Sequence, residues 1–110
     1  MTLFRQERLS SLYRETISSF FEKNFKPEGA LLSVTKVEIA AGLRHLKIYL
    51  SIWPDEKSGA ILKYLRNLKK ELRTHLGKVV KTKFTPTLEL VLDESLKNQS
   101  KIEELLKKTK

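Results

Sequence analysis

The chain has 110 residues, 40% hydrophobic and 32% charged, which is the size and composition of a single globular domain. It contains no cysteine, which excludes disulfide bonds, thiolate nucleophiles and cysteine-ligated zinc. The N-terminus lacks the apolar run of a secretory signal, and no stretch approaches the roughly 18 apolar residues of a membrane span. We therefore expect a soluble cytoplasmic protein without a membrane partner.

The net charge of +9 is concentrated in one segment of the chain. Residues 57–83 hold nine Lys or Arg against one Asp or Glu, whereas the remainder is close to neutral. A positive charge gathered in this way implies a polyanion or an acidic protein surface as the partner.

Residues 5–24 are predicted to form an amphipathic helix, because apolar side chains recur there with a period of 3.6 residues. Pro27 disfavours helical backbone at the residue before it, so the helix is expected to end at the stretch 26–29.

Two strands and a hairpin turn are predicted next. Residues 31–39 are rich in Leu, Val, Ile and Thr, but their alternation changes phase, which predicts a bulge near Thr35 and Lys36. Residues 40–42 then resemble a turn. Residues 46–52 alternate cleanly between apolar and polar, as in a half-buried strand.

The second half of the chain is predicted to hold a helix and a third strand. Residues 53–59 are expected to be a loop, with Asp55 or Ser58 as the helix N-cap. Leucine-rich spacing predicts a helix over 61–76, ended by Gly77, and alternation predicts a strand over 84–92. We expect this strand to run parallel to one of the first two, giving an α+β domain with helices on one face of a three-stranded mixed sheet.

The domain is expected to cover residues 1–95, followed by a tail over 96–110. Ser100 and Glu103 form a capping-box pattern in that tail, which predicts a short helix there.

Catalytic and metal-binding chemistry is not evident in the sequence. His45 and His75 fall on different predicted elements, and the four isolated glycines form no phosphate-binding loop. The acidic pairs at 55–56 and 93–94 are interpreted as charges at helix starts. We therefore predict no catalytic residue, no metal and no cofactor.

The predicted helix over 61–76 separates leucines from cations. Its apolar residues lie within about 80° of one another, and the cations at 63, 66, 70 and 73 span a similar arc on the opposite side. Only Glu71 carries the opposite sign, whereas ordinary solvated faces mix charges, so polyanion binding is favoured over simple solvation. Tyr49 and Trp53 are weaker candidates for stacking on bases, and for Trp53 the alternative is packing under a loop.

The sequence as a whole resembles the ribosome-binding factor A family, over about residues 5–106. The motifs that carry the resemblance are Arg5-x-x-Arg8, Val37-x-Ile39, Leu43 followed by Leu46-Lys47-Ile48-Tyr49, Leu72-Arg73-x-x-Leu76 and Pro86-x-Leu88-x-Leu90-x-x-Asp93-x-Ser95.

This resemblance implies a type II KH-like fold, α-β-β-α(α)-β, with a helix-turn-helix crossover. It also implies a non-catalytic factor that binds the immature 30S subunit through the 16S rRNA precursor, assists late rRNA maturation and matters in cold adaptation. The family bends its crossover at an Ala-x-Gly kink, where this chain has Leu68-Lys69-Lys70, so a straighter helix is also open. Gly42 stands where the family usually has Asp.

Combining charge and resemblance, we expect a monomer whose cations contact rRNA phosphates. The expected RNA-binding residues are Arg8, Lys63, Arg66, Lys69, Lys70, Arg73, Lys78, Lys81 and Lys83. The main alternative is a basic interaction module that binds an acidic protein, such as an assembly GTPase or a ribosomal protein. DNA binding is a third option, weakened because no recognition helix stands out.

Overall fold

The computed structural model describes residues 2–40, 42, 44–82 and 84–94. Within these ranges, three helices and three strands follow one another in the order α-β-β-α-α-β. Their bounds are α1 Thr2–Asn24, β1 Leu31–Ala40, β2 His45–Trp53, α2 Asp55–Asn67, α3 Lys69–Val79 and β3 Thr87–Leu92. The predicted tail helix and the boundary between domain and tail lie outside the described residues.

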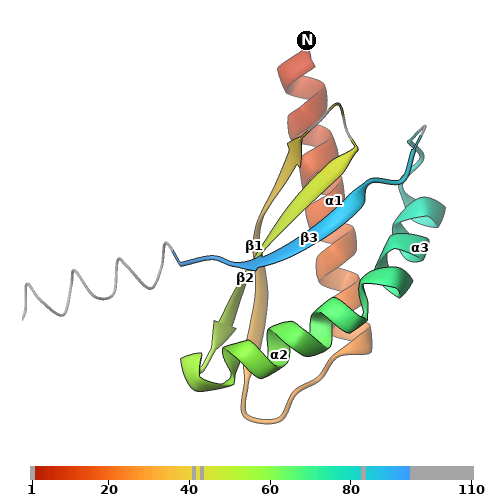
Figure 1. Cartoon of the computed structure of the whole chain (residues 1–110). Coiled ribbons are helices and arrows are strands. Elements are labelled where there is room, and N and C mark those ends of the chain that lie inside the picture. Colours follow the sequence, from red (N-terminus) through yellow and green to blue (C-terminus); the bar gives the residue numbers. More distant parts are fainter. Residues whose placement is uncertain (1, 41, 43, 83, 95–110) are drawn as a thin grey trace, which may run out of the picture.

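The sheet has the mixed topology that was predicted. Strand β2 is central, pairs antiparallel with β1 and pairs parallel with β3, so the strand order is β1-β2-β3 (Figure 1). The predicted bulge is confirmed, because the register with β2 shifts between Val34 and Lys36. This extra residue lets both halves of β1 turn their apolar side chains inward.

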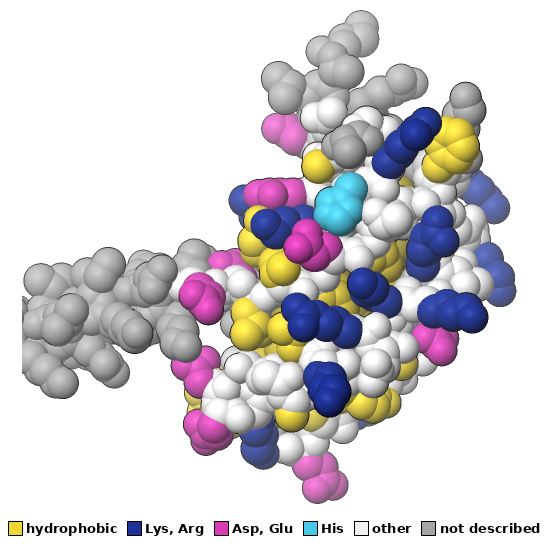
Figure 2. Space-filling view, viewed as in Figure 1, with side chains coloured by type: hydrophobic (Ala, Val, Ile, Leu, Met, Phe, Trp, Pro, Cys, Tyr) yellow, Lys and Arg dark blue, Asp and Glu magenta, His cyan; other side chains and the backbone are white. Residues whose placement is uncertain are grey.

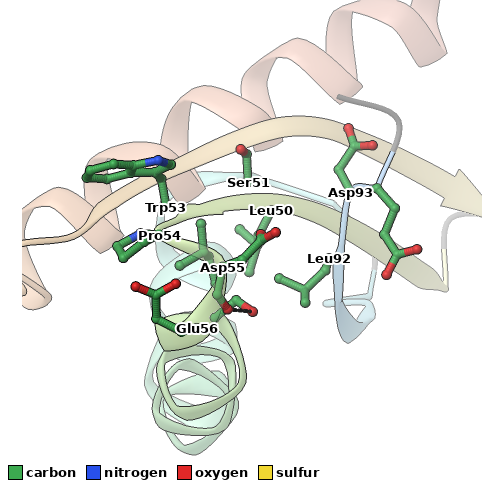
Figure 3. Close-up of a pocket in the computed structure, with 11 residues that line it drawn as sticks. Leu50, Ser51, Trp53, Pro54, Asp55, Glu56, Leu92 and Asp93 are labelled. Carbon is green, nitrogen blue, oxygen red and sulfur yellow. Dashed lines mark hydrogen bonds between the residues drawn. The ribbon is translucent and has the colours of Figure 1, made fainter. Parts of the chain in front are cut away.

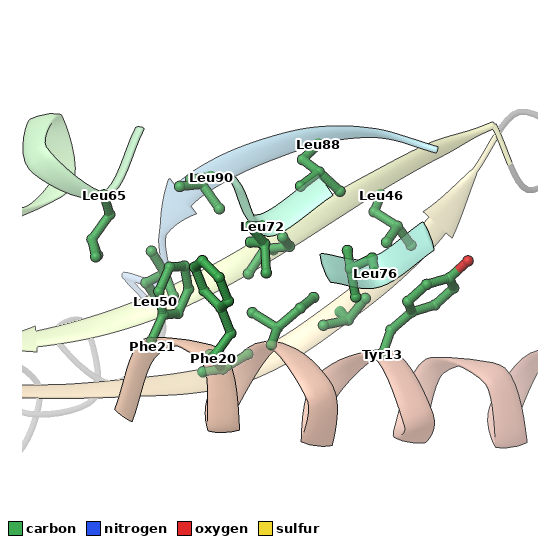
Figure 4. Close-up of a cluster of buried hydrophobic side chains, with 14 of the residues drawn as sticks. Tyr13, Phe20, Phe21, Leu46, Leu50, Leu65, Leu72, Leu76, Leu88 and Leu90 are labelled. Atoms are coloured by element: carbon green, nitrogen blue, oxygen red, sulfur yellow. The ribbon is translucent and has the colours of Figure 1, made fainter. Parts of the chain in front are cut away.

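One hydrophobic core joins all three helices to a single face of the sheet (Figure 4). The apolar positions of β2 are buried, as their alternation predicts, and helix α1, which lies against β1 and α3, adds Tyr13, Ile17 and Phe20 to the same core. The leucines of α2 and α3 complete the core, with Leu65 and Leu72 both 0% exposed. The prediction of helices on one face and of inward leucines is confirmed.

The crossover is broken into two helices at Leu68, so the straighter alternative is wrong. Leu68 adopts φ −88° and ψ 0°, and it serves as the C-cap of α2 and the N-cap of α3. This backbone conformation occurs in ordinary turns and needs no glycine. Partial burial of the Leu68 side chain against the core stabilises the break where the family has small residues.

Four predicted boundaries are wrong. Helix α1 starts three residues earlier than predicted, and α2 already begins at Asp55, with Pro54 as N-cap and no side-chain cap. Asp55 and Glu56 instead place negative charge in the first turn, where the helix dipole favours it. The Ser58 hydroxyl donates to the Asp55 carbonyl oxygen (2.7 Å) within that turn.

The other two boundaries lie around the segment between α3 and β3. Helix α3 continues past Gly77 to Val79, and a Cβ at Gly77 would lie 3.0 Å from the Thr85 hydroxyl, so the glycine permits close approach of the following segment. Strand β3 begins only at Thr87. Phe84 is therefore not part of the strand but of an exposed turn before it.

Candidate nucleic-acid interface

Most of the predicted cations come together on the crossover side of the molecule. Figure 2 shows Lys and Arg side chains gathered over α2, α3 and the neighbouring strand β3. Among the described residues of the crossover, every Lys and Arg is exposed except Lys69, which is half-buried. We call this set the basic surface: Lys63, Arg66, Lys69, Lys70, Arg73, Lys78 and Lys81.

The basic surface carries more positive than negative charge, and its cations are not held in ion pairs within the described residues. Within the described residues, the ion pairs are Lys36–Glu38 (2.7 Å) and His45–Glu89 (3.2 Å), and neither includes a residue of this surface. Lys70 and Lys78 lie about two helical turns apart along α3 and border one shallow depression, in which Glu71 is the acidic residue. Exposed cations without carboxylate partners can replace the counterions of a phosphate backbone.

Two arginines of the basic surface also hold the edge of the sheet. Arg66 Nη2 donates to the Leu90 carbonyl oxygen (3.2 Å), and Arg73 donates to the carbonyl oxygens of Pro86 (3.1 Å) and Thr85 (3.0 Å). Leu90 belongs to β3, the edge strand, whereas Thr85 and Pro86 belong to the segment that leads into it. Arg66 therefore covers part of the strand edge and Arg73 holds the segment before it, while each guanidinium keeps its charge and further donors.

Two predicted residues are not placed on this surface. Arg8 is exposed on α1, where it borders a shallow pocket together with Glu7 and Glu15 on the same helix. It therefore belongs to a neighbourhood of mixed charge. Lys83 lies outside the described residues.

The two proposed stacking residues have different surroundings. Tyr49 lies on the open face of the sheet, with Lys36 Nζ 5.3 Å and Lys47 Nζ 5.4 Å from its ring centre, and its hydroxyl donates to Glu38 (3.2 Å). The side-chain hydrogen bond between Lys36 and Glu38 raises the pKa of Lys36 and lowers the pKa of Glu38. The negative charge of Glu38 is the second cause of the raised pKa of Lys36. The Tyr49 ring is thus already engaged.

Trp53 is 64% exposed rather than packed under a loop. It borders a pocket of about 390 Å³ at the carboxyl ends of β2 and β3 (Figure 3). The same pocket is bordered by four carboxylates, from Asp55, Glu56, Asp93 and Glu94. A phosphate backbone would be repelled there, so Trp53 is poorly placed for stacking on RNA.

The sequence interpretation missed two residues at the opposite end of these strands. Arg44 precedes β2 and Phe84 precedes β3, and the guanidinium carbon lies 5.2 Å from the centre of the phenyl ring. The alternation over 84–92 predicts that Phe84 belongs to a strand, and this pattern does not indicate that its ring is exposed. No signal in the sequence linked it to a residue forty positions earlier.

The described residues contain no group of three or more His, Asp or Glu side chains that could hold a metal ion. None of the helices in the described part of the chain is both long enough and apolar enough to span a bilayer.

Comparison with known proteins agrees with the architecture. The crystal structure of ribosome-binding factor A from Thermus thermophilus superposes with a TM-score of 0.70 and 20% identity, over 79% of this chain and 94% of that one. A homology model of the Thermus thermophilus protein, fitted into a cryo-EM map of a complex of 30S with that factor, gives a TM-score of 0.64 and 17% identity, over 77% and 91%. The KH-like fold class is confirmed.

Comparison of sequences establishes the family. Ribosome-binding factor A of Halothermothrix orenii is 35% identical over 108 residues, covering 96% of this chain and 88% of the relative. The protein of the same name from Prosthecochloris aestuarii is 35% identical over 106 residues, covering 94% and 87%. The family model of ribosome-binding factor A matches residues 5–106. The chain therefore belongs to the ribosome-binding factor A family.

Proposed function

We propose that this chain is a non-catalytic assembly factor that binds the immature 30S subunit through its 16S rRNA precursor. The observation that carries the proposal is the basic surface, whose seven cations form no ion pair among the described residues. Family membership supports the choice of ligand, since the Thermus thermophilus relative has been fitted into a map of a 30S complex.

The cations of this surface divide into two kinds. Lys69, Lys70, Lys78 and Lys81 have flexible side chains that can adapt to phosphate groups. Arg66 and Arg73 are held by backbone carbonyl groups, so they offer charge at fixed positions. Phosphate contacts of this kind position a protein without reading bases, and the shape of the rRNA would supply specificity.

The remaining predicted contacts are secondary in this proposal. Lys63 lies on α2, the helix that begins with Asp55 and Glu56, so negative charge on the same helix weakens its attraction for phosphates. Arg8 has Glu7 and Glu15 near it, which weakens its attraction for phosphates. Lys83 is included on sequence position alone.

We further propose that the protein acts as a cytoplasmic monomer, assists late maturation of the rRNA and is most needed in the cold. These points rest on family membership. RNA duplexes become more stable as temperature falls, so incorrectly paired precursor would need a bound factor more in the cold.

The test is co-sedimentation of the purified protein with immature 30S particles and with mature 70S ribosomes, over a series of salt concentrations. We expect binding to the immature particles, with an affinity that falls steeply as salt rises. Lys69→Glu, Lys70→Glu and Lys78→Glu combined should abolish it, because three charges that attract phosphates become repulsive. Among the described residues, none of these lysine side chains forms an ion pair, so the fold should be kept. Arg73 is left intact, since its loss would confuse binding with stability.

A shallow salt dependence, or full binding by the triple variant, would overturn the phosphate model. Capture of the protein by ribonuclease-treated particles would then indicate an acidic protein partner, such as an assembly GTPase or a ribosomal protein.

A further inference from the structure

Arg44 and His45, where the chain enters β2, are fastened to Thr87, the first residue of β3. The Thr87 backbone N–H donates to the Arg44 carbonyl oxygen (2.9 Å), and the Thr87 hydroxyl donates to the same oxygen (3.2 Å). The His45 ring lies 3.0 Å from the Thr87 hydroxyl and 3.2 Å from the Glu89 carboxylate. Two surface segments forty residues apart are therefore held together as one tip.

An arginine and a phenylalanine meet on the surface of this tip. The guanidinium carbon of Arg44 lies 5.2 Å from the centre of the Phe84 ring, and Phe84 remains 53% exposed with the arginine in place. The Thr82 hydroxyl donates to the Phe84 carbonyl oxygen (2.8 Å), which fixes the backbone that carries the ring. The ring is thus positioned by its own loop and still open to solvent.

The surroundings of this pair are positive. No carboxylate of the described residues lies within ion-pair distance of Arg44, and the nearest acidic side chain along β3, Glu89, is engaged by His45. Lys81 is exposed in the segment that carries Phe84, and Lys78 is exposed in the last turn of α3. The tip is therefore continuous along the chain with the basic surface.

We propose that the Arg44–Phe84 pair binds one unpaired nucleotide of RNA. The base stacks on the exposed part of the phenyl ring, and the guanidinium edge and Lys81 bind the flanking phosphates. A guanidinium lying against an aromatic ring keeps its edge donors available, so the two contacts are compatible. This inference rests on the proposed RNA-binding function and adds to it the class of RNA feature recognised.

The purely structural alternative is that Arg44 only shields Phe84 from water. Such shielding would leave little of the ring exposed, whereas more than half of this residue is open. It would also not require the three hydrogen bonds that join the two segments, or the fourth that fixes the backbone at Phe84.

The test uses two short RNAs of equal length. One is a hairpin with 2-aminopurine as an unpaired base in its loop, and the other is a fully paired duplex with 2-aminopurine within the stem. Phe84→Leu removes the aromatic ring but keeps an apolar side chain. Trp53→Leu is the matched control, because Trp53 is a similarly exposed aromatic residue at the acidic end. Thermal unfolding confirms that both variants are folded.

We expect the wild-type protein to quench the loop fluorophore and to prefer the hairpin. Phe84→Leu should lose this quenching and weaken hairpin binding by about 5- to 150-fold, the effect of one stacked base, with an unchanged salt slope. Arg44→Ala should lower the slope of log K against log salt by about 0.7, the effect of one lost phosphate contact to a single strand.

The two proposals fail differently. If Phe84→Leu behaves like wild type while the lysine triple variant does not bind, the stacking inference is overturned and RNA binding stands. If Trp53→Leu loses quenching instead, the stacking site lies at the other end. If the wild-type protein binds neither RNA nor immature subunits, both proposals are overturned.

Discussion

The two ends of the parallel strand pair β2 and β3 carry opposite charge. His45 and Thr87 are the first residues paired between these strands, and this marks the first end. Leu50 and Leu92 are the last residues paired, and they mark the second end, about 17 Å further along. Arg44, Lys81 and Lys78 lie at or near the first end. Four carboxylates surround the pocket at the second end (Figure 3).

This difference would orient the protein on a polyanion. An RNA surface attracts the first end and repels the second, so long-range electrostatics can select one orientation before any contact forms. Each end also exposes one aromatic residue, and Arg44 lies against Phe84 at the first end, whereas carboxylates border the pocket beside Trp53 at the second. Charge, rather than aromatic exposure, distinguishes the two ends.

The largest expected effect is the loss of three lysines of the basic surface, one of which, Lys78, lies near the first end. Replacing Lys69, Lys70 and Lys78 with Ala should weaken binding to immature 30S particles about 10²- to 10³-fold at about 0.1 M salt, because three phosphate contacts are lost. The slope of log K against log salt, measured by titration, should fall by about 2 to 3. If affinity falls less than about tenfold and the salt slope is unchanged, these lysines do not contact phosphates, and the proposed role of the charge difference is wrong.

The second prediction separates binding charge from structural charge within the basic surface. Arg73→Ala should lower the free energy of unfolding by about 1–2 kcal/mol, because the Pro86 and Thr85 carbonyl groups lose their donor. Lys70→Ala should change it by less than about 0.5 kcal/mol. Denaturant unfolding measures both, and equal effects would show that Arg73 does not stabilise the edge.

Arg73→Lys refines this prediction. It keeps the positive charge but not the forked donors, so affinity for RNA should be largely kept while the loss of stability remains.

A smaller effect is expected at the acidic end. Asp55→Asn with Glu56→Gln should lower the free energy of unfolding by about 0.3–1 kcal/mol, because α2 loses negative charge in its first turn. Affinity for RNA should rise slightly, by less than about threefold, because salt screens the repulsion between these carboxylates and phosphates bound at a distance from them. A decrease in affinity would place this end at the interface.

The smallest effect concerns the Lys36–Glu38 pair on the open sheet face, between the two ends. Since the pKa of Glu38 is lowered in the folded protein, the carboxylate stabilises the fold above its ordinary pKa, and this contribution is lost as pH falls through the lowered value. The raised pKa of Lys36 sets the alkaline limit, above which the contribution is also lost.

Thermal unfolding of wild type and Glu38→Gln over pH should therefore show a small difference at neutral pH that vanishes in acid. A difference that grows in acid would contradict the sign of this shift.

Much of the fold could be predicted because its signals are local. The alternation over β2 and the change of phase in β1 report directly which side chains face the core, so both strands and the bulge at Thr35 were correct. The break at Leu68 was left open, because a turn of ordinary backbone conformation leaves no glycine or proline in the sequence. The start of α2 was missed because its N-cap is Pro54, which provides no side-chain cap.

The candidate site was predicted only in part, for a related reason. A helical wheel shows that Arg66 and Arg73 face away from the leucines, but not that the edge of β3 lies within their reach. The Arg44–Phe84 contact depends on parallel pairing of strands that are distant in sequence. Such tertiary placement cannot be read from periodicity.

The break at Leu68 has a consequence for recognising relatives of this chain. Because its backbone angles suit any ordinary residue, the bend between α2 and α3 can survive while the small residues that mark it elsewhere drift away. A search pattern that demands Ala-x-Gly at the bend would overlook such sequences. The buried leucines on either side, Leu65 and Leu72, are a more durable signature, since the core constrains them whatever stands at the bend.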